Sequence, residues 1–400
     1  MLKKTPLNAW HRAAGAKMTD FAGWDMPISY PTGPIEEHRL VRRSAGLFDV
    51  SHMGQFHVSG PGALDYLQRL VSADLLSVAE QGSTYALLCR EDGGVLDDVF
   101  LYNLPGRWLV VVNAANRGKD FAWFADHLPN GGERGASGGA AGAVGDPQSG
   151  ASRSAGSLDG VLLEDVSDET AMFAFQGPAA LSVMDRLTDD RASAIPRFAA
   201  AELELAGLPA PAAGRALTVG RTGYTGEDGV ELFVPAAIAQ AVWERLLDEA
   251  ESAGVEAGPV GLAARDSLRF EPGFALYGHE LTEEITPVEA RVTWACDLEK
   301  GFIGRDAIAA RKAEKPRVRL ATIRMTERGV PREGYRVLRD GREVGWVATG
   351  MYAPTADDYC ANVFVERALA KVGTDVDIEI RGRTKHAVVV KRPLYTPAYR

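Results

Sequence analysis

Two stretches of the sequence place acidic residues inside predicted β-strands. Arg90–Tyr102 reads REDGGVLDDVFLY, and Gly223–Val234 reads GYTGEDGVELFV. Each is an Asp-Gly turn followed by an apolar β run, which contains Asp97 and Asp98 in the first stretch and Glu231 in the second. Free acids are depleted in half-buried strands. Two such strands in one chain predict a pocket that needs fixed carboxylates.

The chemistry of these acids depends on the face of the strand that each occupies. Because side chains alternate in a strand, Asp97 and Asp98 cannot both point inward. One buried carboxylate would accept or orient a proton, or hold a developing cation; alternatively, both are surface acids near a turn. Glu231 faces away from Val230 and Leu232. It is either an exposed acid or an acceptor for two adjacent N–H donors, as on an amidine-like or guanine-like ring edge.

Three further side chains are candidates with common structural alternatives. Arg265 lies four residues before Arg269 in a helical pattern. It is either a salt-bridged helix arginine or a clamp for a substrate carboxylate. His52 is a general base, a ligand or a structural histidine, and no second His or Cys stands at metal spacing, so no metal is predicted. Trp294 either stacks on a flat ring or packs in the core.

The composition disfavours several classes of partner. The chain has 400 residues, 46% of them hydrophobic and 24% charged, with a formal net charge of −10. This acidic balance argues against general binding of nucleic acid or of anionic membranes. No run of about 18 apolar residues appears, so no membrane span is predicted. No GxGxxG follows a strand and no GxxxxGK[ST] occurs, so a nucleotide is not expected.

The N-terminus and the cysteines predict the compartment. MLKKTPLNAWHR lacks the apolar stretch of a signal peptide. The three cysteines, Cys89, Cys296 and Cys360, are far apart and form no CxxC pair. Neither a disulfide framework nor a structural zinc site is therefore predicted. A reducing cytoplasm fits these features best.

An internal repeat predicts two related lobes. Phe56–Leu70 and Phe173–Leu187 match at seven positions without a gap, and each reads as a strand, a Gly-Pro break and an amphipathic helix. β runs and another helix follow each copy, an order that resembles a ferredoxin-like or split βαβ unit. From about Pro316, short alternating runs predict a small β barrel. The predicted class is therefore α+β, with two lobes and a C-terminal all-β domain.

Ten motifs, taken together, carry a resemblance to a known family. They lie between Thr5 and Cys296 and read, in order, TPLNAWH, DFAGWDMPISY, FDVSHMG, EDGGVLDDVFLY, VVNAANR, FQGPAA, GYTGEDGVELFV, GLAARDSLRFE, LYGHEL and TPVEARVTWAC. In this order and at these spacings, the chain resembles the aminomethyltransferase, or T-protein, of the glycine cleavage system. The first motif begins at Thr5, which leaves no room for a transit peptide and again predicts a cytoplasmic location.

The resemblance implies a tetrahydrofolate-dependent reaction. The family takes an aminomethyl group from the lipoyl arm of H-protein, releases ammonia, leaves dihydrolipoyl H-protein and forms 5,10-methylenetetrahydrofolate. It also implies a fold of three domains around a folate cavity. The expected domains are lobe A, which binds folate (1–50 with 160–290), lobe B (51–128), a flexible Gly/Ala/Ser-rich segment (129–159) and the barrel domain (300–400).

The resemblance also assigns roles to individual residues. Asp98 matches the family's essential acid, which activates the folate amine and handles its proton. Glu231 matches the acid that binds the pterin ring edge, and Arg265 and Tyr399 match the folate site, where Arg265 suits the glutamyl carboxylate. Further residues fall where the family lines its pocket: Tyr85, Tyr102, Asn113, Tyr224 and Trp294.

Two departures and two rival functions accompany this interpretation. Phe274 stands where some relatives carry Tyr, and Ala353 where the family often has Ser.

The first rival is a folate-dependent demethylase acting on a small methylated substrate on the same scaffold. The second is a folate-binding protein without turnover, which the intact Leu96-Asp97-Asp98 motif disfavours.

Overall fold

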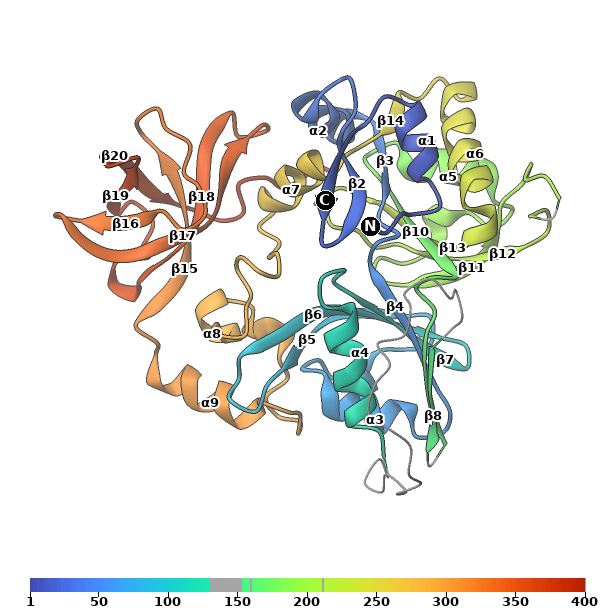
Figure 1. The fold of residues 1–400 in the computed structure, drawn as a ribbon, viewed down its shortest axis with the longest axis horizontal. Coiled ribbons are helices and arrows are strands. Elements are labelled where there is room, and N and C mark those ends of the chain that lie inside the picture. The colour runs from blue at the N-terminus through green and yellow to red at the C-terminus, as the bar shows by residue number, and fades with distance from the viewer. Residues whose placement is uncertain (130–152, 159, 211, 400) are drawn as a thin grey trace.

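The chain forms two α+β lobes and a β barrel (Figure 1). The computed structural model describes residues 1–129, 153–158, 160–210 and 212–399. No helix in this described part combines the length and apolar composition that crossing a membrane requires. These two lobes and the closed barrel confirm the predicted α+β class with a C-terminal all-β domain. Each lobe has a six-stranded sheet, larger than the four-stranded ferredoxin-like unit that the sequence predicts.

Lobe B is an antiparallel sheet with helices packed on one face. In pairing order its strands are β5 (Ser83–Cys89), β6 (Val95–Leu104), β7 (Arg107–Val112), β4 (Gly54–Ser59), β9 (Val161–Asp165) and β8 (Arg153–Leu158). Its helical segments are α3 (Ala63–Leu70), η1 (Leu75–Ser77) and α4 (Arg117–Asp126). Leu67 and Leu70 of α3 and Phe124 of α4 are fully buried against the sheet. The predicted apolar stripe of α3 is therefore the face that packs.

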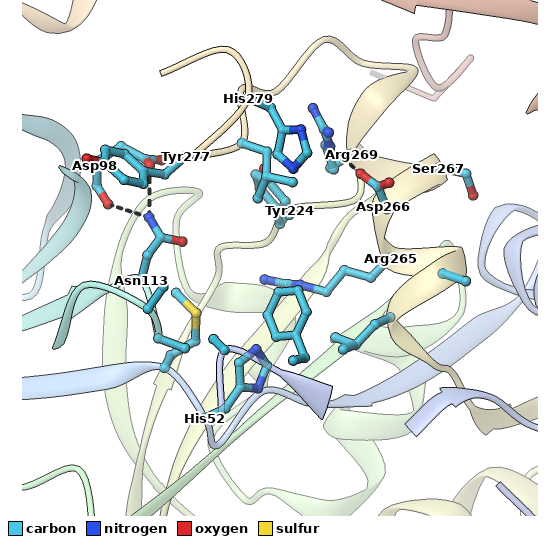
Figure 2. Close-up of a pocket in the computed structure, with 18 of the residues that line it drawn as sticks. His52, Asp98, Asn113, Tyr224, Arg265, Asp266, Ser267, Arg269, Tyr277 and His279 are labelled. Atoms are coloured by element: carbon cyan, nitrogen blue, oxygen red, sulfur yellow. Dashed lines mark hydrogen bonds and ion pairs between the residues drawn. The ribbon is translucent and has the colours of Figure 1, made fainter. Parts of the chain in front are cut away.

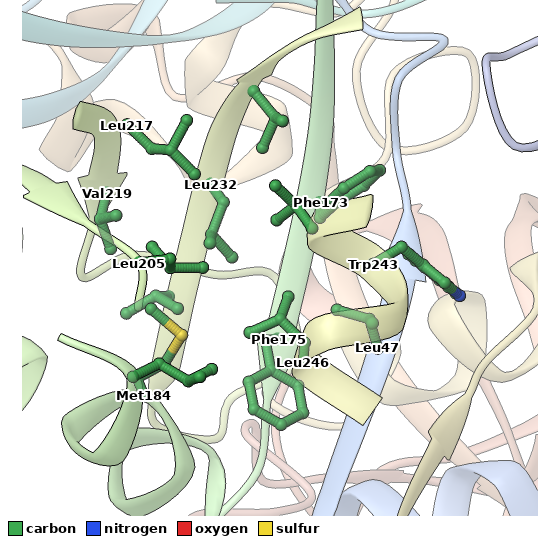
Figure 3. Close-up of a cluster of buried hydrophobic side chains, with 14 of the residues drawn as sticks. Leu47, Phe173, Phe175, Met184, Leu205, Leu217, Val219, Leu232, Trp243 and Leu246 are labelled. Carbon is green, nitrogen blue, oxygen red and sulfur yellow. The ribbon is translucent and has the colours of Figure 1, made fainter. Parts of the chain in front are cut away.

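Lobe A repeats this plan and adds the N-terminal segment. In pairing order its strands are β11 (Ala200–Glu204), β12 (Ala216–Gly220), β13 (Gly229–Pro235), β10 (Thr170–Gln176), β3 (Ala45–Asp49) and β14 (Ala257–Pro259). Its remaining elements are α1 (Asn8–Ala13), β1 (Lys17–Phe21), β2 (Trp24–Ser29), α2 (Pro34–Arg43), α5 (Ala180–Leu187), η2 (Ala192–Ala194), η3 (Ala236–Ile238), α6 (Ala239–Ser252) and α7 (Leu262–Phe270). The core between sheet and helices holds Phe173, Phe175 and Trp243 (Figure 3), with the rings of Phe173 and Trp243 5.3 Å apart.

The C-terminal part is a closed antiparallel barrel. Its strands follow the order β15 (Val318–Met325), β18 (Asp358–Glu366), β17 (Arg342–Ala353), β16 (Arg336–Arg339), β19 (Asp375–Ile380) and β20 (Arg383–Val390). The connecting segments are α8 (Pro287–Ala290), η4 (Thr293–Ala295), α9 (Arg305–Glu314) and η5 (Arg367–Leu369). β16 and β17 form a hairpin. Asp340 and Gly341 both have positive φ there, as a two-residue turn with the twist of a β-hairpin requires.

The two lobes exchange a strand. β9, which leads into lobe A in the sequence, pairs with β4 of lobe B, and β3, which leads into β4, pairs with β10 of lobe A. The local contacts are repeated as well. Ser51 Oγ donates to Asp49 Oδ1 at 2.6 Å, and Ser167 Oγ donates to Asp165 Oδ1 at 2.5 Å. Each sheet is thus completed by chain from the other half.

Two expectations need correction. Of the predicted flexible segment, 130–152 and 159 lie outside the described residues, but Arg153–Leu158 is a strand because it pairs with β9. β9 itself belongs to the sheet of lobe B, not of lobe A. The other domain limits stay predictions. The two acid-bearing strands occupy different places in their lobes, since β6 is the second strand after α3 and β13 is the third after α5.

A buried ion network joins the barrel to lobe A. Arg42 of α2 donates to Glu227 at 2.8 Å and to Glu271 at 3.0 Å. The backbone N–H of Thr355, between β17 and β18, donates to Glu271 at 2.7 Å. Burial alone would raise the pKa of Glu271, but the hydrogen bond from His38 and those from its other partners lower it to about 2. The charged form of Glu271 therefore holds α2, α7 and the barrel together.

The repeated serine contacts lead to a stability prediction. Ser167 Oγ also accepts from the Gln55 N–H at 2.8 Å, so Ser167→Ala leaves this buried N–H without a partner and removes one of the hydrogen bonds to Asp165. We expect it to lower the free energy of unfolding by ~1–3 kcal/mol, measured by thermal denaturation against the exposed control Ser182→Ala. Equal melting of the two variants would show that the contact contributes nothing.

Candidate active site

A cavity of about 630 Å³ lies where the two lobes and the barrel meet (Figure 2). Seven of the nine residues predicted for the site line it: Tyr85, Asp98, Tyr102, Asn113, Tyr224, Glu231 and Arg265. Side chains of the barrel, including Met351 and Tyr352, complete the lining. The cavity is thus built from all three parts of the fold, as the resemblance implies.

The alternation of β6 aims Asp98 into this cavity. Val99 and Leu101 point to the helix-covered core of lobe B, so Asp98 and Tyr102 share the opposite face. Asp97 points toward α4, where it is fully buried. Only the second of the two adjacent acids therefore reaches the cavity.

Asn113 connects the two acids. Its Nδ2 donates to Asp97 Oδ1 and to Asp98 Oδ1, both at 2.9 Å, and its backbone N–H donates to Asp97 Oδ2 at 2.9 Å. Asn116 Nδ2 donates to Asp97 Oδ1 at 2.7 Å. Asp97 therefore fixes the Asn113 amide, and Asn113 in turn orients the Asp98 carboxyl.

The surroundings of Asp98 suit proton transfer near neutral pH. Burial raises the pKa of Asp98 to about 7, and the neighbouring charge of Asp97 acts in the same direction. The hydrogen bonds from Asn113 and Tyr85 act against this rise. A carboxyl group with such a pKa exchanges its proton readily at physiological pH, which is the property a general base needs.

Glu231 faces the same cavity from lobe A. Val230 and Leu232 point into the core of that lobe, which places Glu231 on the other face of β13. Tyr102 Oη donates to Glu231 Oε2 at 2.9 Å, and Thr222 Oγ1 donates to the same oxygen at 2.6 Å. Oε1 has no hydrogen-bond partner among the described residues. This free oxygen is the acceptor that Glu231 offers to a bound molecule.

Arg265 supplies a cation with spare donors. It lies on α7 with its guanidinium 4.9 Å from the centre of the Tyr224 ring (Figure 2). Its Nη1 is buried without a hydrogen-bond partner in the described part of the chain. Burial lowers the pKa of Arg265, and the charge of Glu231 opposes this effect. An unpaired buried guanidinium nitrogen suits a carboxylate or carbonyl oxygen of a ligand.

Two residues predicted for the pocket do not line the cavity. Trp294 is 72% exposed and stacks on Tyr85 with ring centres 5.4 Å apart. Tyr399 is 51% exposed, and its hydroxyl donates to Glu227 of the Arg42 network. Trp294 therefore supports a wall of the cavity from outside, and Tyr399 fastens the C-terminal tail to lobe A.

The structure also defines the contributions of Thr222, His52 and Phe274. Thr222 holds Glu231, but an isolated threonine after a strand carries no recognisable signal. His52 lines the cavity with Nδ1 unpartnered among the described residues. Burial lowers its pKa to about 4, which keeps it neutral. Phe274 stacks on Tyr224 with ring centres 5.8 Å apart, so this departure from the family supports the wall by packing.

The site has the features of an enzyme that acts on a bound small molecule. It encloses a carboxyl group with a near-neutral pKa, a second carboxylate and an unpaired guanidinium. No group of three or more His, Cys, Asp or Glu side chains suited to a metal ion occurs in the ranges that the structure describes.

Comparisons with known proteins identify the family. Residues 7–300 match the family model described as GCVT N-terminal domain, and 319–396 match the glycine cleavage T-protein C-terminal barrel domain. The aminomethyltransferases of Herpetosiphon aurantiacus and Geobacillus kaustophilus are 43% and 42% identical to this chain, with 100% of both chains covered in each case. The crystal structure of glycine cleavage system aminomethyltransferase T from Bartonella henselae has a TM-score of 0.84, with 30% identity and 99% of each chain covered.

The chain therefore belongs to the aminomethyltransferase (T-protein) family of the glycine cleavage system. Members of this family are folate-dependent transferases. The resemblance inferred from the ten sequence motifs is confirmed.

The contacts of Asn113 predict how the pKa of Asp98 can be changed. Because the Asn113 hydrogen bond lowers that pKa, Asn113→Ala should raise it by about 1 unit, the ordinary scale of one hydrogen bond. Carboxyl carbon chemical shifts followed across pH in aspartate-labelled protein would measure the change. Asn103→Ala, which removes a side chain that donates to Val78 O instead, is the matched control. A lowered or constant pKa would contradict the role of Asn113.

Proposed function

We propose that this protein transfers the aminomethyl group on the lipoyl arm of H-protein to tetrahydrofolate. The products are 5,10-methylenetetrahydrofolate, ammonia and dihydrolipoyl H-protein. The observation that carries the proposal is Asp98, a carboxyl group with a pKa of about 7 that faces a cavity of family-typical architecture. A cytoplasmic location accompanies the proposal as a prediction from the sequence.

The residues of the cavity fit a reduced folate. Glu231 Oε1 would accept from an N–H on the pterin edge, and Arg265 Nη1 would donate to an oxygen of the folate. The apolar side chains of Phe100 and Met351 in the lining suit the rings. Tetrahydrofolate supplies the nitrogen that receives the one-carbon unit.

Asp98 would perform the proton transfers. As a carboxylate it accepts a proton from the attacking folate amine, and as a neutral acid it returns a proton to the departing ammonia. Asn113 keeps its oxygen in one orientation during both steps. The burial of Asp98 strengthens these interactions.

One experiment separates the proposed transferase from its rivals. The protein is incubated with tetrahydrofolate and aminomethyl-lipoyl H-protein, and ammonia and methylenetetrahydrofolate are followed. We expect both products. Turnover of a free methylated donor, but not of H-protein, would replace the proposal with the demethylase. Folate binding without either activity would indicate a binding protein.

The role of Asp98 predicts a catalytic defect without a binding defect. Asp98→Asn cannot accept a proton, so turnover should fall at least ~100-fold while the dissociation constant for folate changes less than about tenfold. Single-turnover kinetics and equilibrium binding measure the two quantities. Asp126→Asn, an exposed acid on α4, is the control. Wild-type turnover in Asp98→Asn would exclude Asp98 as the base.

The role of Glu231 predicts the opposite pattern. Glu231→Gln removes a charged acceptor, and the loss of one charge-assisted hydrogen bond should weaken folate binding roughly 10–100-fold. Fluorescence titration with tetrahydrofolate measures this change, and the exposed Glu169 provides the control variant Glu169→Gln. An unchanged dissociation constant would remove Glu231 from the folate site.

A further inference from the structure

Besides Asp97 and Asp98, a third buried carboxyl group lies on the α4 side of β6 and has no assigned role. Asp120 is on α4, the helix that covers lobe B, and its side chain is fully buried. Neither carboxyl oxygen of Asp120 receives a hydrogen bond from the described residues. Its carboxyl group is in hydrogen-bonding contact with that of Asp97. Buried polar atoms are rarely left without partners, so Asp120 requires an explanation.

The hydrogen bonds of Asp97 indicate which of the two groups carries the charge. An ionised carboxylate has about four acceptor positions. Three on Asp97 are used, by the Asn113 N–H, Asn113 Nδ2 and Asn116 Nδ2. One position remains for Asp120. The surroundings of Asp97 therefore suit a carboxylate anion, which accepts a hydrogen bond from each neighbour. Asp120 has no donor beside it in the described part of the chain, so its carboxyl group can form a hydrogen bond only by donating one.

The charges around Asp120 lead to the same conclusion. It faces Asp97 of β6, the charge of Asp98 acts on it from the other face of that strand, and the charge of Lys119 on its own helix opposes both. The Lys119 ammonium donates instead to Leu96 O, to Tyr277 Oη and to Glu283. Its charge is thus shared with an acid outside the cluster. Carboxylates this close cannot all be ionised without compensation.

We propose that Asp120 is held as a neutral carboxylic acid whose hydroxyl donates to Asp97, and that this pair is the positioning device for Asn113 and Asp98. The proton on Asp120 fills the fourth acceptor position of Asp97. Asp97 then holds Asn113 by two bonds, and Asn113 Nδ2 holds Asp98 Oδ1.

The protonation state has a direct consequence for the base. Burial raises the pKa of Asp120 to about 11, and the charge of Asp97 adds to the rise. Asp120 therefore stays neutral across the range in which Asp98 titrates. An ionised Asp120 would repel the charged form of Asp98 and raise its pKa. The shared proton thus allows Asp98 to titrate near neutrality although two further acids lie behind it.

Infrared spectroscopy of the free protein tests the protonation state. At pH 8.5, where Asp98 is ionised, we expect a C=O stretching band of a protonated carboxyl group that shifts in deuterium oxide. The band should be absent in Asp120→Asn and present in the control Asp126→Asn. A wild-type minus Asp120→Asn spectrum that contains only carboxylate bands would overturn the proposal.

Turnover tests the positioning role, and only this part rests on the proposed function. In Asp120→Asn the amide N–H replaces the hydroxyl as donor to Asp97, so we expect kcat to stay within about threefold of wild type. Asp120→Ala has no donor, and its kcat should fall at least ~10-fold while KM for folate changes less than about twofold. Wild-type kcat in Asp120→Ala would refute the positioning role.

The pH profile covers the case in which Asp120→Ala fails to fold. Because Asp120→Asn removes no charge from a neutral acid, the apparent pKa of kcat should lie within about 0.3 units of the wild-type value. A clear downward shift would show that Asp120 is ionised in the wild type, and would overturn the proposal. If the wild-type protein fails to turn over H-protein, the proposed function falls, while the infrared result still decides the state of Asp120.

Discussion

The pairing of buried charges around α7 is the constraint on which the rest of the structure depends. Arg42 is held between Glu227 and Glu271, and Arg269 of α7 is held by Glu280 at 3.0 Å. Removing one member of such a pair leaves an uncompensated charge in the interior, at a cost of about 3–5 kcal/mol. These ion pairs therefore fix α7 against the barrel, and α7 is the helix that carries Arg265 into the cavity.

The cavity exists only because strand faces from different parts of the chain meet. The face of β6 that carries Asp98 also carries Tyr102, whose hydroxyl crosses to Glu231 of lobe A. Asp97 lies on the opposite face of β6 and points toward α4. Its neighbours there are Asn113, Asn116 and Asp120. Asp97 and Asp98 thus have separate roles, because side chains alternate along the strand. Asp98 faces the cavity, whereas Asp97 holds Asn113, which orients Asp98.

The sequence predicted much of this arrangement and could not predict the rest. The spacing of Asp98, Glu231 and the internal repeat reflects local patterns of strand and helix, and the structure places these elements as expected. The exchange of β3 and β9 could not be read from the sequence, because an antiparallel pairing depends on which edge is free in the folded lobe. That Trp294 and Tyr399 do not line the cavity has a related reason. Their aromatic character is visible in the sequence, but the direction in which a side chain leaves a short turn or a tail is set by its tertiary contacts. Thr222 and Asp120 carry no distinctive pattern, so their roles emerge only from their neighbours in space.

The exchanged strands have a consequence for synthesis of the chain. When residues 51–128 have left the ribosome, the β4 edge of their sheet still lacks β9, and β3 still lacks β10. An open strand edge is a template for wrong pairing with other chains. The nascent protein therefore carries two open strand edges until the middle of its sequence has been translated.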